Sequence, residues 1–291
     1  MLSFPSQRVH GMPDEGNPIR QSVAADGSDS LSILVPTRNE AANVEQLLRR
    51  ISAAVAGVRT EILFVDDSDD DTPAAIRAAA QVADDCSVVL LHRRRELRWG
   101  GLSGAVVDGL RLASGQWVCI MDADLQHPPE AISRLLTKAK HECADLVIAS
   151  RYADQGDAAG LNAGRTLISR ACTAAARCLF PLRLRGVSDP MSGFFLVRRA
   201  AVDTSRLQPR GFKILLELLV RSGDLRTDEV GFVFASRHAG ESKGSLHEGL
   251  TYLRRLCELR LGLQPGSEVT RGTQAPTVEA LTATAASVGK R

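Results

Sequence analysis

Pairs of carboxylates follow two short apolar runs of the sequence, and their spacing suits metal binding. Asp66 and Asp67 come directly after one run, and Asp122 and Asp124 come directly after another. Two carboxylates separated by a single residue can both bind a hard divalent cation through oxygen, and such a cation can also grip a diphosphate. The sequence therefore predicts a Mg²⁺ or Mn²⁺ site at Asp122 and Asp124.

Aspartates in turns also cap helices, and this alternative has different weight at the two clusters. It is favoured for the aspartates at 69–71, because Asp is a common turn residue before a helix. It is weaker for Asp122 and Asp124, because Asp is a poor strand residue and the two charges repel each other.

The elements that must position these carboxylates are predicted to be strands of a mostly parallel sheet covered by helices. Short apolar runs alternate with longer amphipathic segments from Leu31 onwards. Strands are expected at 31–35, 61–65, 87–91, 117–121 and 146–149, and helices at 40–55, 72–82, 104–113 and 129–140. We expect Pro36 to stop the first strand and Thr37 or Asn39 to cap the next helix. Ligands of such a Rossmann-like sheet bind at the carboxyl ends of its strands, where the aspartates lie.

Composition limits the class of protein. The chain has 291 residues, with 36 Lys and Arg against 34 Asp and Glu. That balance excludes a surface that coats nucleic acid, so no nucleic-acid partner is expected. The six cysteines show neither a C-x-x-C pair nor zinc spacing, which favours reduced thiols.

The two ends differ from the middle of the chain. Residues 1–29 lack the features of a signal peptide and are predicted to be a disordered arm. Residues 264–291 are rich in small and polar residues and are predicted to be a disordered tail. A single catalytic domain is expected at 30–263, and none of its apolar runs approaches the ~20 residues of a membrane span.

Seven motifs occur in a fixed order along this domain. They are PTRNE at 36–40, VDDS at 65–68, MDADLQHPP at 121–129, SRY at 150–152, SDPMSGFF at 188–195, GFKI at 211–214 and GESK at 240–243. Together they resemble family 2 glycosyltransferases of the GT-A fold, and within them the dolichyl- and polyprenyl-phosphate mannose synthases. Two features depart from the family pattern. An aromatic residue is commoner where Arg38 stands, and the stretch after Asp66 is one residue shorter.

The resemblance implies an inverting, metal-dependent enzyme that moves a hexose from a nucleotide sugar onto a polyprenyl or dolichyl phosphate. Mannose from GDP-mannose is the leading choice. Such an acceptor is already anionic at neutral pH, so a catalytic histidine is not needed. His127 lies in the metal motif, whereas His92 is expected to be a surface or packing residue.

The resemblance also implies roles for individual residues on the donor side. Pro36, Arg38 and Glu40 would frame the nucleotide, and Asp66 would accept a hydrogen bond from its base. Gln126 would join the two metal-binding aspartates as a third ligand of Mg²⁺ or Mn²⁺.

The resemblance also implies three cations that meet phosphate groups, with Arg237 on the acceptor side of the crevice. Arg151 and Arg237 would clamp phosphate oxygens, since a planar guanidinium binds two at once. Lys243 would add positive charge.

Two arginine-rich segments, 163–185 and 246–263, raise the question of membrane contact. Basic amphipathic helices can lie at the surface of an anionic membrane, which would place the protein peripherally on the cytoplasmic face, alone or with a membrane partner subunit. The alternative is that both helices pack on the sheet with their arginines in solvent. It stays open for the first segment and is slightly favoured for the second.

Other functions remain open at this stage. The same fold could use UDP-glucose or another donor, or a soluble acceptor. A nucleotide-sugar-binding protein without turnover is disfavoured, because the metal motif and Arg151 are intact.

Overall fold

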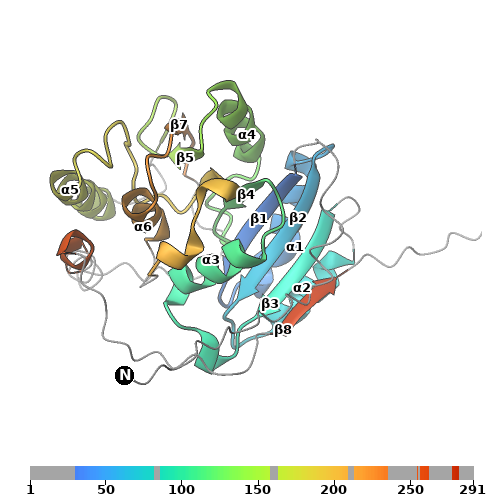
Figure 1. Cartoon of the computed structure of the whole chain (residues 1–291). Helices are drawn as coiled ribbons and strands as arrows, with labels where there is room; N and C mark the ends of the chain where they lie inside the picture. The colour runs from blue at the N-terminus through green and yellow to red at the C-terminus, as the bar shows by residue number, and fades with distance from the viewer. Residues whose placement is uncertain are drawn as a thin grey trace, which may run out of the picture.

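A computed structural model describes residues 30–81, 86–157, 163–208, 213–234, 254, 256–261 and 277–281. Its strands form one eight-stranded sheet in the order β7-β5-β6-β4-β1-β2-β3-β8, and helices cover both faces (Figure 1). The strands are β1 (Ser30–Thr37), β2 (Arg59–Asp66), β3 (Cys86–His92), β4 (Trp117–Ile120), β5 (Leu146–Ser150), β6 (Phe195–Arg198), β7 (Thr227–Gly231) and β8 (Thr277–Leu281). The α-helices are α1 (Ala41–Ala54), α2 (Thr72–Ala80), α3 (Gly101–Leu112), α4 (Ala131–His141), α5 (Ala163–Leu179) and α6 (Ile214–Arg221).

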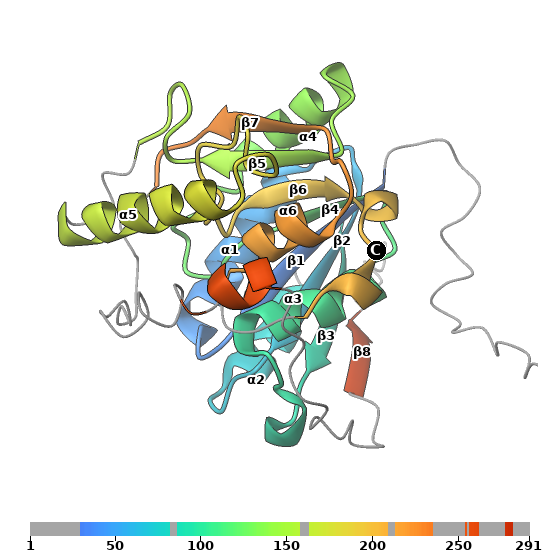
Figure 2. The ribbon, with the colours of Figure 1, turned by 60° about the vertical axis from the view of Figure 1, so that its left-hand side comes forward.

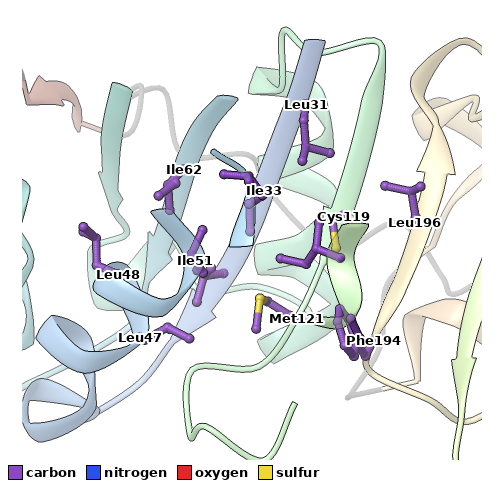
Figure 3. Packing of buried hydrophobic residues seen from close by; sticks show 14 of the residues in the cluster. Leu31, Ile33, Leu47, Leu48, Ile51, Ile62, Cys119, Met121, Phe194 and Leu196 are labelled. Atoms are coloured by element: carbon purple, nitrogen blue, oxygen red, sulfur yellow. The ribbon is translucent and has the colours of Figure 1, made fainter. Parts of the chain in front are cut away.

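Two apolar cores hold the helices on the sheet. Residues of α1, α2 and α4 pack with one face of the strands, and Figure 3 shows Leu47, Leu48 and Ile51 of α1 directed toward Ile33 and Ile62. Residues of α3, α5 and α6 pack on the other face. Because both faces are covered, the central strands read as continuous apolar runs rather than as alternating patterns.

The direction of the strands determines which residues lie together at the carboxyl ends of the parallel strands. β1, β2, β3 and β4 are mutually parallel, and β5 and β7 are parallel to each other. β6 lies between β4 and β5 and runs antiparallel to both. The residues that precede β6 therefore reach the same edge as the residues that follow β4 and β5.

The predicted sheet with flanking helices is confirmed, and two local predictions are wrong. β1 continues through Pro36 to Thr37, because its pairing with β4 ends at Leu34 and a missing N–H costs little beyond that point. Neither Thr37 nor Asn39 caps α1, since Glu40 occupies the cap position without a side-chain bond. The Thr37 hydroxyl donates instead to Asp66, at the end of β2, and the Asn39 side chain accepts the N–H of Asp69 in the loop that follows.

The tail prediction also needs correction at residues 277–281. They form β8, which pairs antiparallel with β3 and becomes an edge of the sheet. An ion pair between Arg77 and Glu279, with a closest N···O distance of 2.9 Å, ties β8 to α2. Of this strand, Leu281 packs against the hydrophobic core, whereas Val278 is exposed, so the segment has no alternating apolar pattern that its sequence could reveal. The rest of the predicted arm and tail lies outside the described residues.

α5 corresponds to most of the first arginine-rich segment and projects beyond the sheet (Figure 2). The helix ends before Pro181, as the sequence indicated, and Phe180 is buried in the core. Leu182, in the following turn, is 86% exposed. Of the second segment, Arg254 and residues 256–261 are described as helical. Among all described helices, none combines the length and the apolar character that crossing a bilayer requires.

Candidate active site

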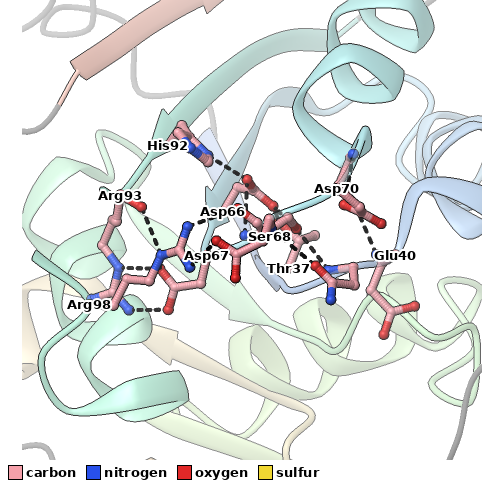
Figure 4. Close-up of polar contacts among 12 residues, drawn as sticks. Thr37, Glu40, Asp66, Asp67, Ser68, Asp70, His92, Arg93 and Arg98 are labelled. Carbon is pink, nitrogen blue, oxygen red and sulfur yellow. Dashed lines mark hydrogen bonds and ion pairs between the residues drawn. The ribbon is translucent and has the colours of Figure 1, made fainter. Parts of the chain in front are cut away.

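The loops after β1 and β2 are bonded to each other and form one wall of the site. The Thr37 hydroxyl donates to Asp66 at 2.8 Å, and the backbone N–H groups of Asn39 and Glu40 donate to the hydroxyls of Ser68 and Thr72. Figure 4 shows these contacts side by side. Sequence motifs that lie almost thirty residues apart thus form a single rigid surface.

Asp66 is fully enclosed at the end of β2. Its Oδ1 accepts from the hydroxyls of Thr37 and Ser68, and its Oδ2 accepts from the Ser68 N–H at 3.3 Å. The Nδ1 atom of His92 lies 2.6 Å from the same Oδ2 (Figure 4). An ionised carboxylate only accepts, so this contact makes Nδ1 the protonated nitrogen. The predicted bond from a nucleobase to Asp66 stays a prediction, and a base would have to replace one of these donors.

A fully buried arginine, Arg93, holds the loop after β2 in place through hydrogen bonds. Arg93 donates through Nε and Nη2 to both oxygens of Asp67, at 2.8 and 2.6 Å, and through Nη1 to Asp108 at 3.0 Å. Burial lowers the pKa of the guanidinium, and the two carboxylates more than offset it, so its net pKa is raised. Asp67 is therefore committed to the scaffold rather than available to a ligand.

A cavity of about 440 Å³ opens beside this wall, at the carboxyl ends of β2 and β3. Its lining is dominated by charged side chains, Asp69, Asp70, Arg94, Arg95, Glu96 and Arg98, together with the ring of His92. Asp69 accepts from both Arg95 and Arg98, at 3.0 and 2.8 Å. The cavity thus presents both hydrogen-bond donors and acceptors.

The predicted metal ligands lie in a tight loop after β4. The Asp122 side chain is 39% exposed, whereas Asp124 is buried and accepts the N–H of Gln126 at 3.2 Å. Leu125 adopts the left-handed conformation with φ of 62°. Strain of this kind persists where the surroundings impose it, commonly at ligand sites.

Neighbouring residues hold the loop in place. The Nδ1 atom of His127 accepts the N–H of Asp122 at 3.0 Å, and the ring packs among Phe194, Phe232 and Phe234. A Cβ on Gly193 would lie 3.1 Å from Asp122 Oδ2. Gly193 therefore leaves room for the carboxylate.

The donor set fits a hard divalent cation. Asp122, Asp124 and Gln126 offer two carboxylates and one amide oxygen from a single loop, and oxygen ligands of this kind suit Mg²⁺ and Mn²⁺. Over the described residues, clusters of three or more His, Cys, Asp or Glu side chains with metal-binding geometry are absent. A site made of two carboxylates and one amide oxygen is not a cluster of that kind, because glutamine is not among those residue types.

Arg151 lies after β5 and is held by a carboxylate. Its Nε and Nη2 donate to the two oxygens of Asp189 at 2.7 and 2.8 Å, and its backbone N–H bonds to the same group at 3.3 Å. The Arg151 side chain is 12% exposed and Asp189 is fully buried. The guanidinium also lies over the rings of Tyr152 and Phe234. Its predicted contact with a phosphate stays a prediction.

Lys213, immediately before α6, is a further cation of the site. Burial, and then the charge of Arg151, lower the pKa of its ammonium group to about 8, while Asp189 and Asp122 act in the opposite direction. Lys213 therefore lies within electrostatic reach of Asp122 and of the Arg151–Asp189 pair.

A second cavity, of about 370 Å³, lies between α5 and the loop after β5. Tyr152, Arg170, Thr173, Ala174, Arg177 and Ser188 line it. The Thr173 hydroxyl is buried without a hydrogen-bond partner in the described structure. The guanidinium groups of Arg151 and Arg170 both lie over the Tyr152 ring, at 5.5 and 6.0 Å from its centroid.

The structure places most of the predicted site residues at one edge of the sheet. Pro36, within β1, is half-buried, and in the loop that follows β1 Arg38 is exposed and Glu40 is half-buried. Arg237 and Lys243 lie outside the described residues, so their predicted roles stay predictions.

Four site residues were missed or given no role. His92 ends β3. The expectation that ligands bind at the carboxyl ends of the strands, which selected Asp66, would also have selected His92. Asp189 precedes β6, so that expectation excluded it, because the antiparallel direction of β6 was not foreseen. Lys213 stands in the GFKI motif but was given no role, and Arg93 carries no local signal that separates it from other cations of the sequence.

Comparison with known proteins identifies the family. Residues 32–205 match the model described as Glycosyl transferase family 2. A dolichol-phosphate mannosyltransferase of Mycosarcoma maydis is 38% identical over 249 residues, which cover 81% of this chain and 82% of that protein. This chain belongs to glycosyltransferase family 2.

Other family 2 relatives share this similarity. A dolichol-phosphate mannosyltransferase of Pyrococcus furiosus is 38% identical over 79% of this chain, and the match spans 63% of that relative's length. An undecaprenyl-phosphate mannosyltransferase of Micrococcus luteus is 32% identical over 73% of this chain and 86% of its own. The predicted resemblance is confirmed.

A solved structure with the same fold is glucosyl-3-phosphoglycerate synthase from Mycobacterium tuberculosis, in complex with phosphoglyceric acid. It aligns with a TM-score of 0.60 and 23% identity over 87% of each chain. The predicted GT-A architecture is thereby confirmed.

Proposed function

We propose that this family 2 member is an inverting mannosyltransferase that uses GDP-mannose as donor and a polyprenyl or dolichyl phosphate as acceptor. The observation that carries the proposal is that the loop of Asp122 and Asp124, which offers oxygen ligands, lies near the partly buried cations Arg151 and Lys213. The relatives that act on dolichol phosphate and undecaprenyl phosphate support the choice of sugar and acceptor.

The donor would lie across the carboxyl ends of β4, β1 and β2. Its diphosphate would be next to Asp122, Asp124 and Gln126, which we propose hold Mg²⁺ or Mn²⁺. Two strand spacings, about 10 Å, separate β4 from β2, and the 440 Å³ cavity opens there. An extended nucleoside diphosphate is long enough to span such a gap.

The charged lining of that cavity supports a guanine base. Guanine presents the acceptors O6 and N7 and amino and ring N–H donors. Arginines of the cavity can donate to the former, and Asp70 or Asp69 can accept from the latter. Next to the ribose of the nucleotide would lie the residues predicted to frame it, Pro36, Arg38 and Glu40.

The acceptor phosphate would approach from the β5 side. Arg151 and Lys213 supply positive charge next to the metal loop, and we propose that Arg237 and Lys243 add to it. The 370 Å³ cavity beside α5 brings Arg170 and the unpartnered Thr173 hydroxyl to the same side.

The chemistry requires little beyond positioning and charge. A phosphomonoester oxygen is already anionic, so it attacks the anomeric carbon of the sugar as the bond to the nucleoside diphosphate breaks, and the anomeric configuration is inverted. When bound, the metal supplies Lewis-acid stabilisation of the leaving diphosphate. The chain's own residues orient the two phosphates and reduce the repulsion between them.

A panel of labelled nucleotide sugars tests the proposal. Purified protein is incubated with each donor, Mn²⁺ and either a polyprenyl phosphate or a water-soluble phosphomonoester, and the label is counted both in the lipid extract and in the water-soluble product. We expect product only with GDP-mannose and the lipid acceptor. Label from UDP-glucose would overturn the donor, and transfer only to the soluble acceptor would overturn the lipid.

A further inference from the structure

The turn that carries Asp189 is held by a residue of a different strand. The Oε1 atom of Glu229, on β7, accepts the backbone N–H of Ser188 at 2.7 Å and that of Asp189 at 3.3 Å. Glu229 is half-buried. A charged acceptor on two consecutive N–H groups makes a stronger bond than a neutral one and fixes the local backbone.

The same turn is anchored to β5 at two further points. The hydroxyls of Ser188 and Ser150 are hydrogen-bonded, and the Ser192 hydroxyl donates to the carbonyl of Ala149 at 2.7 Å. The β5 side of this contact leads directly into Arg151. Anchoring on both sides leaves the Asp189 carboxylate one orientation, in which both oxygens face the Arg151 guanidinium.

The strand that carries Glu229 is packed tightly against the loop after β5. β7 pairs in parallel with β5, with Gly231 opposite Ser150. A Cβ on Gly231 would come within 2.0 Å of the carbonyl oxygen of Asp154. The position of Glu229 relative to Arg151 is therefore fixed by backbone contacts rather than by flexible side chains.

We propose that Glu229 is a positioning residue of the transfer reaction. It fixes the Ser188–Asp189 turn, Asp189 then fixes the Arg151 guanidinium in a bidentate pair, and Arg151 meets the acceptor phosphate. The inference rests on the proposed function for the last of these contacts. Glu229 bonds to the turn rather than to the guanidinium, and it lies outside the seven sequence motifs.

Burial makes such a relay effective. The Arg151 and Asp189 side chains are almost wholly removed from solvent. If the turn moves, water therefore cannot replace the hydrogen bonds of the pair. A displacement of ~1 Å in a group that positions a substrate can lower the rate about 100-fold.

Kinetics of three variants test the inference. Glu229→Ala removes the acceptor of both N–H groups, and we expect the KM for a polyprenyl phosphate to rise at least about tenfold, with the Kd of GDP changed less than about twofold. Glu229→Gln keeps a carbonyl oxygen and should retain most activity. Asp224→Asn is the control, because this acid, which precedes β7, is fully solvent-exposed, pairs with Arg183 at 2.7 Å and should behave as wild type.

A double-mutant cycle with Arg151→Ala shows whether the effect passes through the guanidinium. We expect Glu229→Ala to cause no further loss in that background, because the group it positions is gone. Additive losses, or an equal loss of GDP affinity, would overturn the inference. So would a wild-type KM in Glu229→Ala when Arg151→Ala is impaired.

Failure of the proposed function has a different signature. It would be seen as an unchanged acceptor KM in Arg151→Ala, or as no lipid product from the wild type. Hydrogen exchange of the Ser188 and Asp189 amides then decides on Glu229, since its loss should accelerate their exchange and leave other amides of the sheet unchanged. Unaltered exchange would overturn the inference.

Discussion

The carboxylate of Asp124 can be tested separately from the fold. Asp124 is buried, and its known bond within the loop is to the N–H of Gln126. Asp124→Asn keeps the size and an acceptor oxygen but removes the charge that a cation requires. We expect transfer to fall by at least about 100-fold, as for loss of one preorganised electrostatic group, with an unchanged melting temperature.

Asp224→Asn is a suitable control, since the Asp224 side chain is fully solvent-exposed. Full activity of Asp124→Asn, or of the wild type in excess EDTA, would contradict the metal assignment.

Lys213 links stability to pH. The native state lowers the pKa of its ammonium group from 10.5 to about 8. Between these values the unfolded state binds more protons than the native state, so stability rises with pH across this window. Below about pH 8 the full cost of burying the charge is present.

Replacement of this lysine should therefore stabilise the protein while it impairs transfer. We expect Lys213→Met to melt at a higher temperature than the wild type at pH 7, and the difference to shrink as the pH approaches 10. Acceptor KM should rise in the same variant. Lower stability of Lys213→Met at pH 7 would contradict the assignment, and thermal melts at pH 7 and 9.5 measure both effects.

At the scale of elements, β8 completes the sheet beside β3. Truncation after residue 276 would expose the backbone groups of Val88–His92 that pair with β8. We expect a lower melting temperature and concentration-dependent self-association, because an unpaired edge strand recruits other chains. Scanning calorimetry and light scattering measure these effects.

A single substitution separates strand pairing from the ion pair on β8. Arg77→Gln removes a half-exposed ion pair, which is worth less than about 1 kcal/mol. It should leave both measurements nearly unchanged. Truncated protein that melts and scatters like the wild type would show that β8 contributes nothing.

The elements also show what the sequence could and could not predict. Asp66, Asp122 and Asp124 were found because each follows a strand whose apolar run is unmistakable. Asp189 and Gly193 were not, because strand direction depends on which neighbours pair, and this information is not local. Glu229 is one acid in a strand rich in polar residues, and only the packing of β7 against the 188–189 turn gives it a partner.

At the scale of the whole molecule, membrane contact depends on which apolar residues face outward. Phe180 is 8% exposed and packs in the core, so an aspartate there would unfold the domain rather than test membrane binding. The described exposed residues of α5 are Arg170, Ala171, Ala174, Arg177 and Cys178. Among the described residues of the two arginine-rich segments, the large apolar side chains that face solvent are Leu182 and Leu261, 86% and 69% exposed.

We therefore propose peripheral association through these leucines and the neighbouring arginines. Wild-type protein should float with anionic vesicles, and Leu182→Asp/Leu261→Asp should float less without loss of stability, because neither side chain is buried. Neutral vesicles and ~0.5 M salt should weaken flotation of both proteins. Equal flotation of the double variant and the wild type would point to a different anchor.

The position of β8 also has a consequence for biosynthesis. β3 is made early, whereas the strand that covers its outer edge follows the residues of every other strand in the sheet. A ribosome-bound chain can therefore assemble the donor half of the domain while β3 remains an open edge. Contacts between such distant segments form slowly, since loop closure must precede them. Nascent chains should be most prone to associate through β3 before residues 277–281 leave the exit tunnel.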